Sequence, residues 1–150
     1  FFGMTDSNYP DLPFNPSVIL LMFILTWTFD SFAYLIGKKL GKTKILPTIS
    51  PKKSWEGFFG GYLFCILVSS LSYFVFEDYF NHISTLSYIL ITIILPFTAT
   101  TGDFIESYYK RKAGVKDSGK IMPGHGGILD RMDAFLITIP VIYIIININK

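Results

Sequence analysis

Four long runs of apolar residues, separated by polar segments, dominate the pattern of this chain. They cover residues 18–36, 58–76, 83–101 and 128–148. Each run is close to the length of about 20 helical residues that crosses the hydrocarbon core of a bilayer. The pattern predicts an all-α, polytopic transmembrane protein with about four membrane helices. We expect residues 1–150 to form a single membrane-embedded domain.

The polar segments between the runs differ in charge. Residues 37–56 contain six lysines and one glutamate, and residues 102–127 contain five cations and three acids. The connection between the second and third runs instead carries Glu77 and Asp78. Because cytosolic loops of membrane proteins are enriched in lysine and arginine, both basic loops are predicted to face the cytosol. The alternation of four helices also requires them to lie on the same side.

Composition supports the bilayer as the main solvent of the chain. Hydrophobic residues make up 51% of the sequence, aromatic residues 17%, and the mean hydropathy is +0.46, which is more than a small soluble domain can bury. The net charge of +2 gives no basic field for nucleic acid, so no nucleic-acid partner is expected. Cys65 is the single cysteine, which excludes an intrachain disulfide. A homodimer is one assembly that the sequence leaves open.

Asp30 lies within the first apolar run. A carboxylate at membrane depth costs about 3 kcal/mol on insertion scales, so it normally faces a wet cavity or a partner. The alternative is a helix that ends sooner, with Asp30 capping the segment that follows.

The segment SPKKSWEGFFGG, residues 50–61, places Lys52 and Lys53 just before a glycine-rich helix start. One interpretation is that the lysines and the helix N-terminus receive a phosphate group. The other is that the lysines bind lipid headgroups at the membrane surface. The residues alone leave both open.

The segment GDFIESYYKRKAG, residues 102–114, follows the third run. If it continues as a helix, one face carries four polar residues with Arg111 beside them. These four residues are Asp103, Glu106, Ser107 and Lys110. Such a face is often only a solvated surface, but the position of Asp103 at the membrane exit favours a site that needs oxygen ligands.

The segment KDSGKIMPGHGGILDRMD, residues 116–133, combines a glycine-rich turn around His125 with two aspartates. Asp130 and Asp133 are three residues apart and would share one helix face. Neighbouring carboxylates repel one another and need a cation to share. Hard oxygen ligands without cysteine favour Mg²⁺, and lysine and arginine nearby indicate phosphate chemistry.

These segments, together with DSFAYLIGKKLGK at residues 30–42, closely resemble the phosphatidate cytidylyltransferase family, also called CDP-diglyceride synthetases. The resemblance covers about residues 27–143, and the sequence GHGGILDRMD is more similar to the bacterial branch of the family than to the eukaryotic one. It implies an integral enzyme of the bacterial cytoplasmic (inner) membrane with its active site facing the cytosol. The implied substrates are CTP and phosphatidic acid. Because members of the family are usually longer, we expect this chain to be the C-terminal catalytic portion.

The resemblance also implies a site. Its metal centre would hold Mg²⁺, with a second, monovalent cation such as K⁺ beside it. By this resemblance the metal ligands are expected to be Asp103 and Asp130, and Asp133 is an additional candidate metal ligand. The cations expected to offset phosphate charge are Lys110, Arg111, Lys116 and Arg131. The expected substrate-binding residues are Lys52, Lys53, Ser107, Asp117, His125, Gly126 and Gly127.

Three alternatives remain. A related CTP-dependent transferase could act on another lipid phosphate with the same chemistry. An ion-coupled membrane transporter would also use intramembrane Asp30, but it predicts carboxylates scattered through several helices. A non-catalytic membrane scaffold leaves the glycine-histidine turn without a role.

Overall fold

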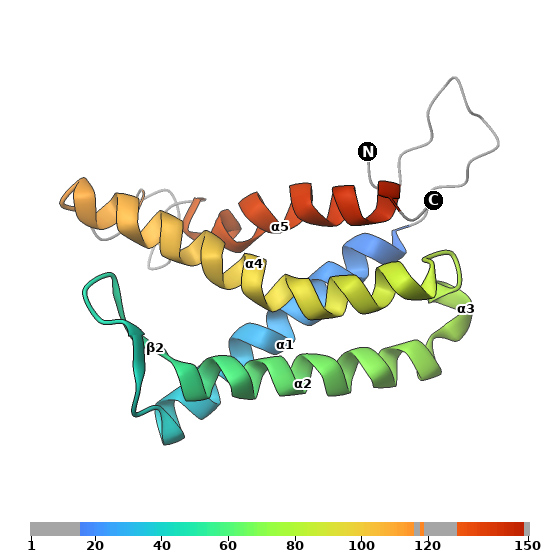
Figure 1. The fold of residues 1–150 in the computed structure, drawn as a ribbon, viewed down its shortest axis with the longest axis horizontal. Helices are drawn as coiled ribbons and strands as arrows, with labels where there is room; N and C mark the ends of the chain where they lie inside the picture. Colours follow the sequence, from blue (N-terminus) through green and yellow to red (C-terminus); the bar gives the residue numbers. More distant parts are fainter. Residues whose placement is uncertain (1–15, 116–117, 119–128, 149–150) are drawn as a thin grey trace.

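The protein, seen in a computed structural model, is built from long helices that run between two ends of the molecule (Figure 1). The structure describes residues 16–115, 118 and 129–148, with side chains from residue 132 onwards in the last range. The long helices are α1 (Ser17–Leu40), α2 (Trp55–Val75), α4 (Thr85–Lys112) and α5 (Leu129–Ile148). The short elements are β1 (Lys44–Leu46), β2 (Ser50–Ser54) and α3 (Glu77–Phe80). Helix α1 packs mainly against α2, and α4 against α5.

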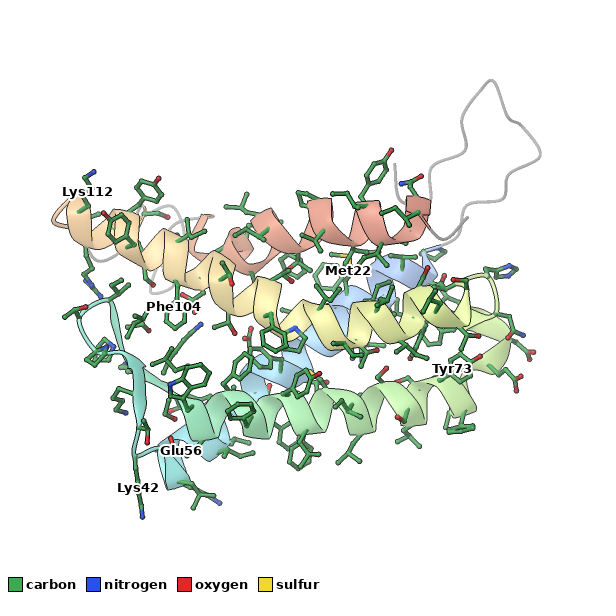
Figure 2. All side chains as sticks on the ribbon, viewed as in Figure 1. Met22, Lys42, Glu56, Tyr73, Phe104 and Lys112 are labelled. Atoms are coloured by element: carbon green, nitrogen blue, oxygen red, sulfur yellow. The ribbon has the colours of Figure 1, made fainter. Side chains whose placement is uncertain are left out.

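The prediction of a polytopic helical membrane protein is confirmed. Three helices, α1, α2 and α4, are long and apolar enough to cross a membrane, and α5 contributes a shorter apolar helix at Met132–Ile148. Large apolar side chains project outward from the helices (Figure 2), and Phe74 and Ile148 are 80% and 77% exposed. A soluble protein would bury such side chains, so lipid is the solvent that suits these surfaces.

The described parts of both basic segments lie at the same end of the helices. The β1–β2 hairpin and the C-terminal end of α4 meet at this end, whereas α3 lies at the other (Figure 1). Helix α4 continues to Lys112 rather than ending near residue 101, because residues 103–112 contain no glycine or proline and include pairs at helical spacing. The predicted polar face of Asp103, Glu106, Ser107 and Lys110 therefore exists.

The hairpin of β1 and β2 is an element that the sequence analysis did not predict. The two strands pair antiparallel with an irregular register between Lys44 and Leu46. Two polar side chains join the hairpin to α2. The Ser54 hydroxyl accepts a hydrogen bond from the Gly57 N–H at 3.2 Å, and the Glu56 carboxylate accepts from the Thr43 N–H at 3.0 Å. These two hydrogen bonds fix the position of the β2 backbone at Lys53 relative to α2.

Small residues bring α1 and α2 into close contact. A Cβ atom on Gly61 would lie 2.8 Å from the Phe29 carbonyl oxygen, and one on Gly57 would lie 2.7 Å from that of Ala33. Helices in membranes associate through such small residues, because apolar contact with lipid is as favourable as contact with another helix. The close approach places Asp30 of α1 near the start of α2.

Candidate metal and phosphate site

Three carboxylates meet where α4 passes the start of α5. Asp103 and Glu106 lie one turn apart on α4, and Asp133 lies on α5. One ligand oxygen from each lies within 4.8 Å of the others. Glu106 is buried, whereas Asp103 and Asp133 are half-buried. We call these three residues the acidic cluster.

Gly102 allows the two helices to approach this closely. A Cβ atom at this position would collide with the Asp133 carbonyl oxygen. Any larger residue would push the start of α5 away from α4, so Gly102 sets the separation of the carboxylates.

Fixed donors orient two members of the acidic cluster. The Ser107 hydroxyl donates a hydrogen bond to Asp103 Oδ1 at 3.2 Å. The Ala134 N–H donates to Asp133 Oδ1 at 2.7 Å. Hydrogen bonds to a charged carboxylate hold its oxygens in place.

Two lysines approach the acidic cluster from different directions. Lys53, at the end of β2, forms an ion pair with Asp103, and its ammonium lies 5.0 Å from the centre of the Phe104 ring. Lys110 lies one turn beyond Glu106 on α4 and pairs with it at 2.9 Å. Among these described residues, two ammonium groups thus face three carboxylates.

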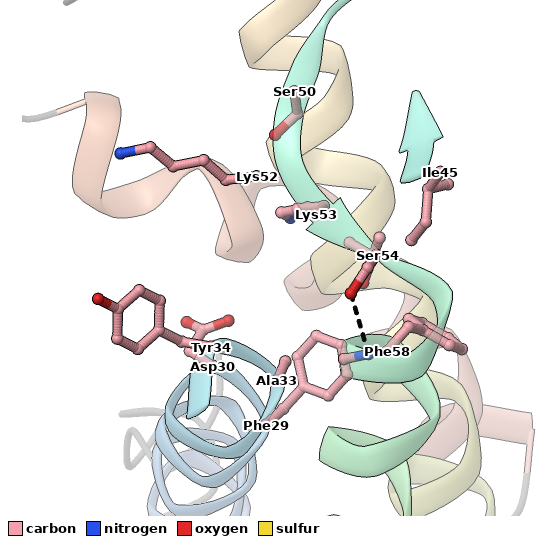
Figure 3. Close-up of a pocket in the computed structure, with 12 residues that line it drawn as sticks. Phe29, Asp30, Ala33, Tyr34, Ile45, Ser50, Lys52, Lys53, Ser54 and Phe58 are labelled. Carbon is pink, nitrogen blue, oxygen red and sulfur yellow. Dashed lines mark hydrogen bonds between the residues drawn. The ribbon is translucent and has the colours of Figure 1, made fainter. Parts of the chain in front are cut away.

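A pocket of about 230 Å³ adjoins the acidic cluster through Lys53 (Figure 3). Its polar lining comes from α1, β2 and α4, and its apolar lining includes Phe29 and Phe58. The polar residues are Asp30, Tyr34, Ser50, Lys52, Lys53, Ser54 and Thr100. The Thr100 hydroxyl is buried and has no hydrogen-bond partner within the described part of the chain.

The acidic cluster fits a divalent cation. Its donors are carboxylate oxygens, which Mg²⁺ prefers, and no described cysteine or histidine lies among them. Carboxylates this close repel one another, and the two lysines balance two of the three negative charges. A cation shared by the cluster would remove the remaining repulsion. Asp103, Glu106 and Asp133 are the described residues that would hold it.

The structure brings most of the described candidate residues together. Asp103, Ser107, Lys110 and Asp133 belong to or contact the acidic cluster, and Lys52 and Lys53 line the pocket. Arg111 is exposed on α4 and makes no ion pair with another described residue. The candidates that lie outside the described residues are Lys116, Asp117, His125, Gly126, Gly127 and the side chains of Asp130 and Arg131.

Two residues, Glu106 and Asp30, have a clearer role in the structure than in the sequence-based expectations. Glu106 was expected on the polar face of a helix but not as a metal ligand, although its spacing of three from Asp103 was a usable signal. Asp30 lines the pocket, as expected for a carboxylate in a membrane helix. Helix α1 continues through it to Leu40, so the alternative of a helix that ends sooner is wrong.

Glu106→Gln should weaken cation binding about 10- to 100-fold, because it removes one of three negative charges from the acidic cluster. Mn²⁺, followed by electron paramagnetic resonance in detergent, is a suitable probe of hard oxygen sites. Glu77→Gln makes the same change in α3, at the other end of the molecule, and should leave Mn²⁺ affinity unchanged. Equal Mn²⁺ affinities of the Glu106 variant and the unmodified protein would show that Glu106 is not a ligand.

Comparison with known proteins gives one consistent result. A model of the cytidylyltransferase family matches residues 5–149. The chain is 47% identical over 128 residues to "Phosphatidate cytidylyltransferase" from Staphylococcus aureus strain COL and from Staphylococcus epidermidis strain RP62A. The corresponding protein of Staphylococcus saprophyticus is 46% identical over 128 residues. Each alignment covers 85% of this chain and 48% of the relative, so the chain spans about half the length of the curated relatives it matches.

Proposed function

The chain belongs to the cytidylyltransferase family, and on this premise we propose that it transfers the cytidylyl group of CTP to phosphatidic acid. The products are CDP-diacylglycerol, a precursor in phospholipid biosynthesis, and pyrophosphate. An oxygen of the phosphatidic acid phosphate forms a bond to the α-phosphorus of CTP. The bond from that phosphorus to the oxygen bridging the α- and β-phosphates breaks, and pyrophosphate leaves with the electron pair.

The observation that carries the proposal is the position of the acidic cluster and Lys53 at one end of the membrane helices. A water-soluble nucleotide has to meet a phosphate that remains attached to a lipid. Both substrates are polyanions, so they approach each other only where cations screen their charge. A site at the membrane boundary with lysines and carboxylates meets both requirements.

Lys53 is proposed to bind a substrate phosphate in the pocket, with Lys52 beside it. Lys110 and Arg111 are proposed to offset charge on the triphosphate as pyrophosphate leaves. Asp103, Glu106 and Asp133 are proposed to hold Mg²⁺, and Asp130 joins them on the basis of the family resemblance. When bound, Mg²⁺ would neutralise part of the negative charge of the phosphates. We also propose a monovalent cation such as K⁺ next to it, from the same resemblance.

The chain does not need a general base for this reaction. A phosphate monoester is already mostly ionised at neutral pH and can attack directly. The protein therefore acts by positioning the two phosphates and by neutralising them. This agrees with a site whose described polar residues are carboxylates, lysines and hydroxyls.

We propose the bacterial cytoplasmic membrane as the location, with the site facing the cytosol. The relatives are bacterial, and the described parts of the two basic segments lie at the same end as the site. Lysine-rich ends of membrane helices remain on the cytosolic side. CTP would then reach the pocket from the compartment in which it is made.

The test is liponucleotide formation by the purified chain in detergent with labelled CTP, phosphatidic acid and Mg²⁺. We expect a labelled lipid that depends on phosphatidic acid and on Mg²⁺. Substituting an unsaturated ether-lipid phosphate examines the related transferase, and preferential turnover of that lipid would reassign the substrate. A folded chain that labels neither lipid would contradict the proposal.

A further inference from the structure

Among the described residues that line the pocket, Asp30 is the one charged residue without a part in the proposed reaction. It lies on α1 within a membrane helix, and its side chain is open to the pocket rather than covered by helix packing. Figure 3 shows Asp30 on α1 facing the strand that carries Lys52 and Lys53. A carboxylate in a membrane helix is costly unless a cation or water stabilises it.

Lys53 is the described cation that acts on Asp30. The two side chains line the same pocket, and the Lys53 charge attracts Asp30, whereas Asp103 and Asp133 repel it. Lys53 itself pairs with Asp103. The Lys53 ammonium therefore interacts with two acidic residues. It forms an ion pair with Asp103 and attracts Asp30 electrostatically across the pocket.

Asp103 cannot bind both the Lys53 ammonium and a metal ion equally well. A divalent cation in the acidic cluster would repel the Lys53 ammonium from Asp103, since both are positive and share one carboxylate. Lys53 would then need another acceptor, and Asp30 is the one carboxylate among the described residues that line the pocket. A lysine held there stays within the cavity instead of extending into water.

We propose that Asp30 is a positioning residue that receives Lys53 when a cation binds Asp103, and so holds the ammonium in the pocket for a phosphate. The inference rests on the proposed function, which supplies the phosphate that Lys53 would bind. The inference itself is that Lys53 exchanges between Asp103 and Asp30. That exchange couples cation binding at the acidic cluster to Asp30 through Lys53.

The coupling can be measured without turnover, by Mn²⁺ binding to the full chain in detergent. Asp30→Asn is expected to weaken Mn²⁺ binding about 10-fold when Lys53 is present, because Lys53 then has no alternative to Asp103. In a Lys53→Met background the same change is expected to alter Mn²⁺ affinity less than about 2-fold, because the exchanging group is absent. Asp78→Asn, at the other end of the molecule, is the matched control and should change nothing in either background.

Two outcomes overturn the inference. An equal loss of Mn²⁺ affinity in both backgrounds would mean that Asp30 acts only through its charge. No loss in either background would mean that Asp30 is not linked to the acidic cluster. Thermal melting of each variant, followed by circular dichroism, confirms that the compared proteins are folded. Since Mn²⁺ binding needs no substrate, failure of this test is distinct from absence of liponucleotide formation.

Discussion

Asp103→Asn should lower kcat for liponucleotide formation about 100- to 1,000-fold, which is the scale of removing a principal electrostatic contact in an active site. Asp103 belongs to the acidic cluster and also pairs with Lys53, so the change affects both the cation and the phosphate-binding lysine. Asparagine has nearly the same shape, and the Ser107 hydroxyl can still donate to its carbonyl oxygen. The measurement is turnover of CTP and phosphatidic acid across a range of Mg²⁺ concentrations.

Asp78→Asn is the matched control for this prediction, because Asp78 lies in α3 at the opposite end of the helices. It should retain the turnover of the unmodified protein. If Asp103→Asn, shown to be folded by circular dichroism, also turns over at a near-normal rate, the assignment of Asp103 to the metal site is wrong.

Lys53→Met should raise KM for phosphatidic acid about 10- to 100-fold, with a smaller effect on kcat. A hydrogen bond to a charged group contributes about 1.5–3 kcal/mol, and each 1.4 kcal/mol corresponds to about tenfold in affinity. Methionine keeps most of the apolar stem of lysine but removes the ammonium, so the variant tests the charge, including its contact with the Phe104 ring. The experiment is steady-state kinetics in mixed micelles with the surface concentration of lipid varied.

Lys39→Met provides the comparison, since Lys39 is exposed in the last turn of α1 and does not line the pocket. Its KM for phosphatidic acid should match that of the unmodified protein. Equal KM values for the Lys53 and Lys39 variants would argue against a phosphate-binding role for Lys53.

The membrane helices could be predicted from the sequence because apolar runs of sufficient length have few other folds available to them. The β1–β2 hairpin could not, since its strands are short and β2 contains Pro51 and two lysines, which are poor strand signals. The hairpin is held instead by contacts distant in sequence, such as that from the Thr43 N–H to Glu56. These contacts become visible only in the folded chain.

The acidic cluster was partly predictable. Helical spacing placed Asp103 and Glu106 on one face of α4. The family resemblance pointed to Asp103 and Asp130 as metal ligands, and Asp133 was an additional candidate ligand; the side chain of Asp130 lies outside the described residues. The spacing did not show that Asp133 of α5 would meet that face, because the meeting depends on the close helix contact at Gly102. The ion pair of Lys53 with Asp103 could not be predicted either, because α2, α3 and about two thirds of α4 separate the two residues in the sequence.

The most direct measurement of the central claim follows label from CTP into lipid. The purified chain is supplied with phosphatidic acid, Mg²⁺ and CTP labelled at either the α- or the γ-phosphorus. Cytidylyl transfer predicts that the α-label enters the lipid fraction and that the γ-label leaves as pyrophosphate. Asp103→Asn should slow both processes about 100- to 1,000-fold. Appearance of the γ-label in lipid, or an α-label that never leaves the water-soluble fraction, would contradict the assigned reaction.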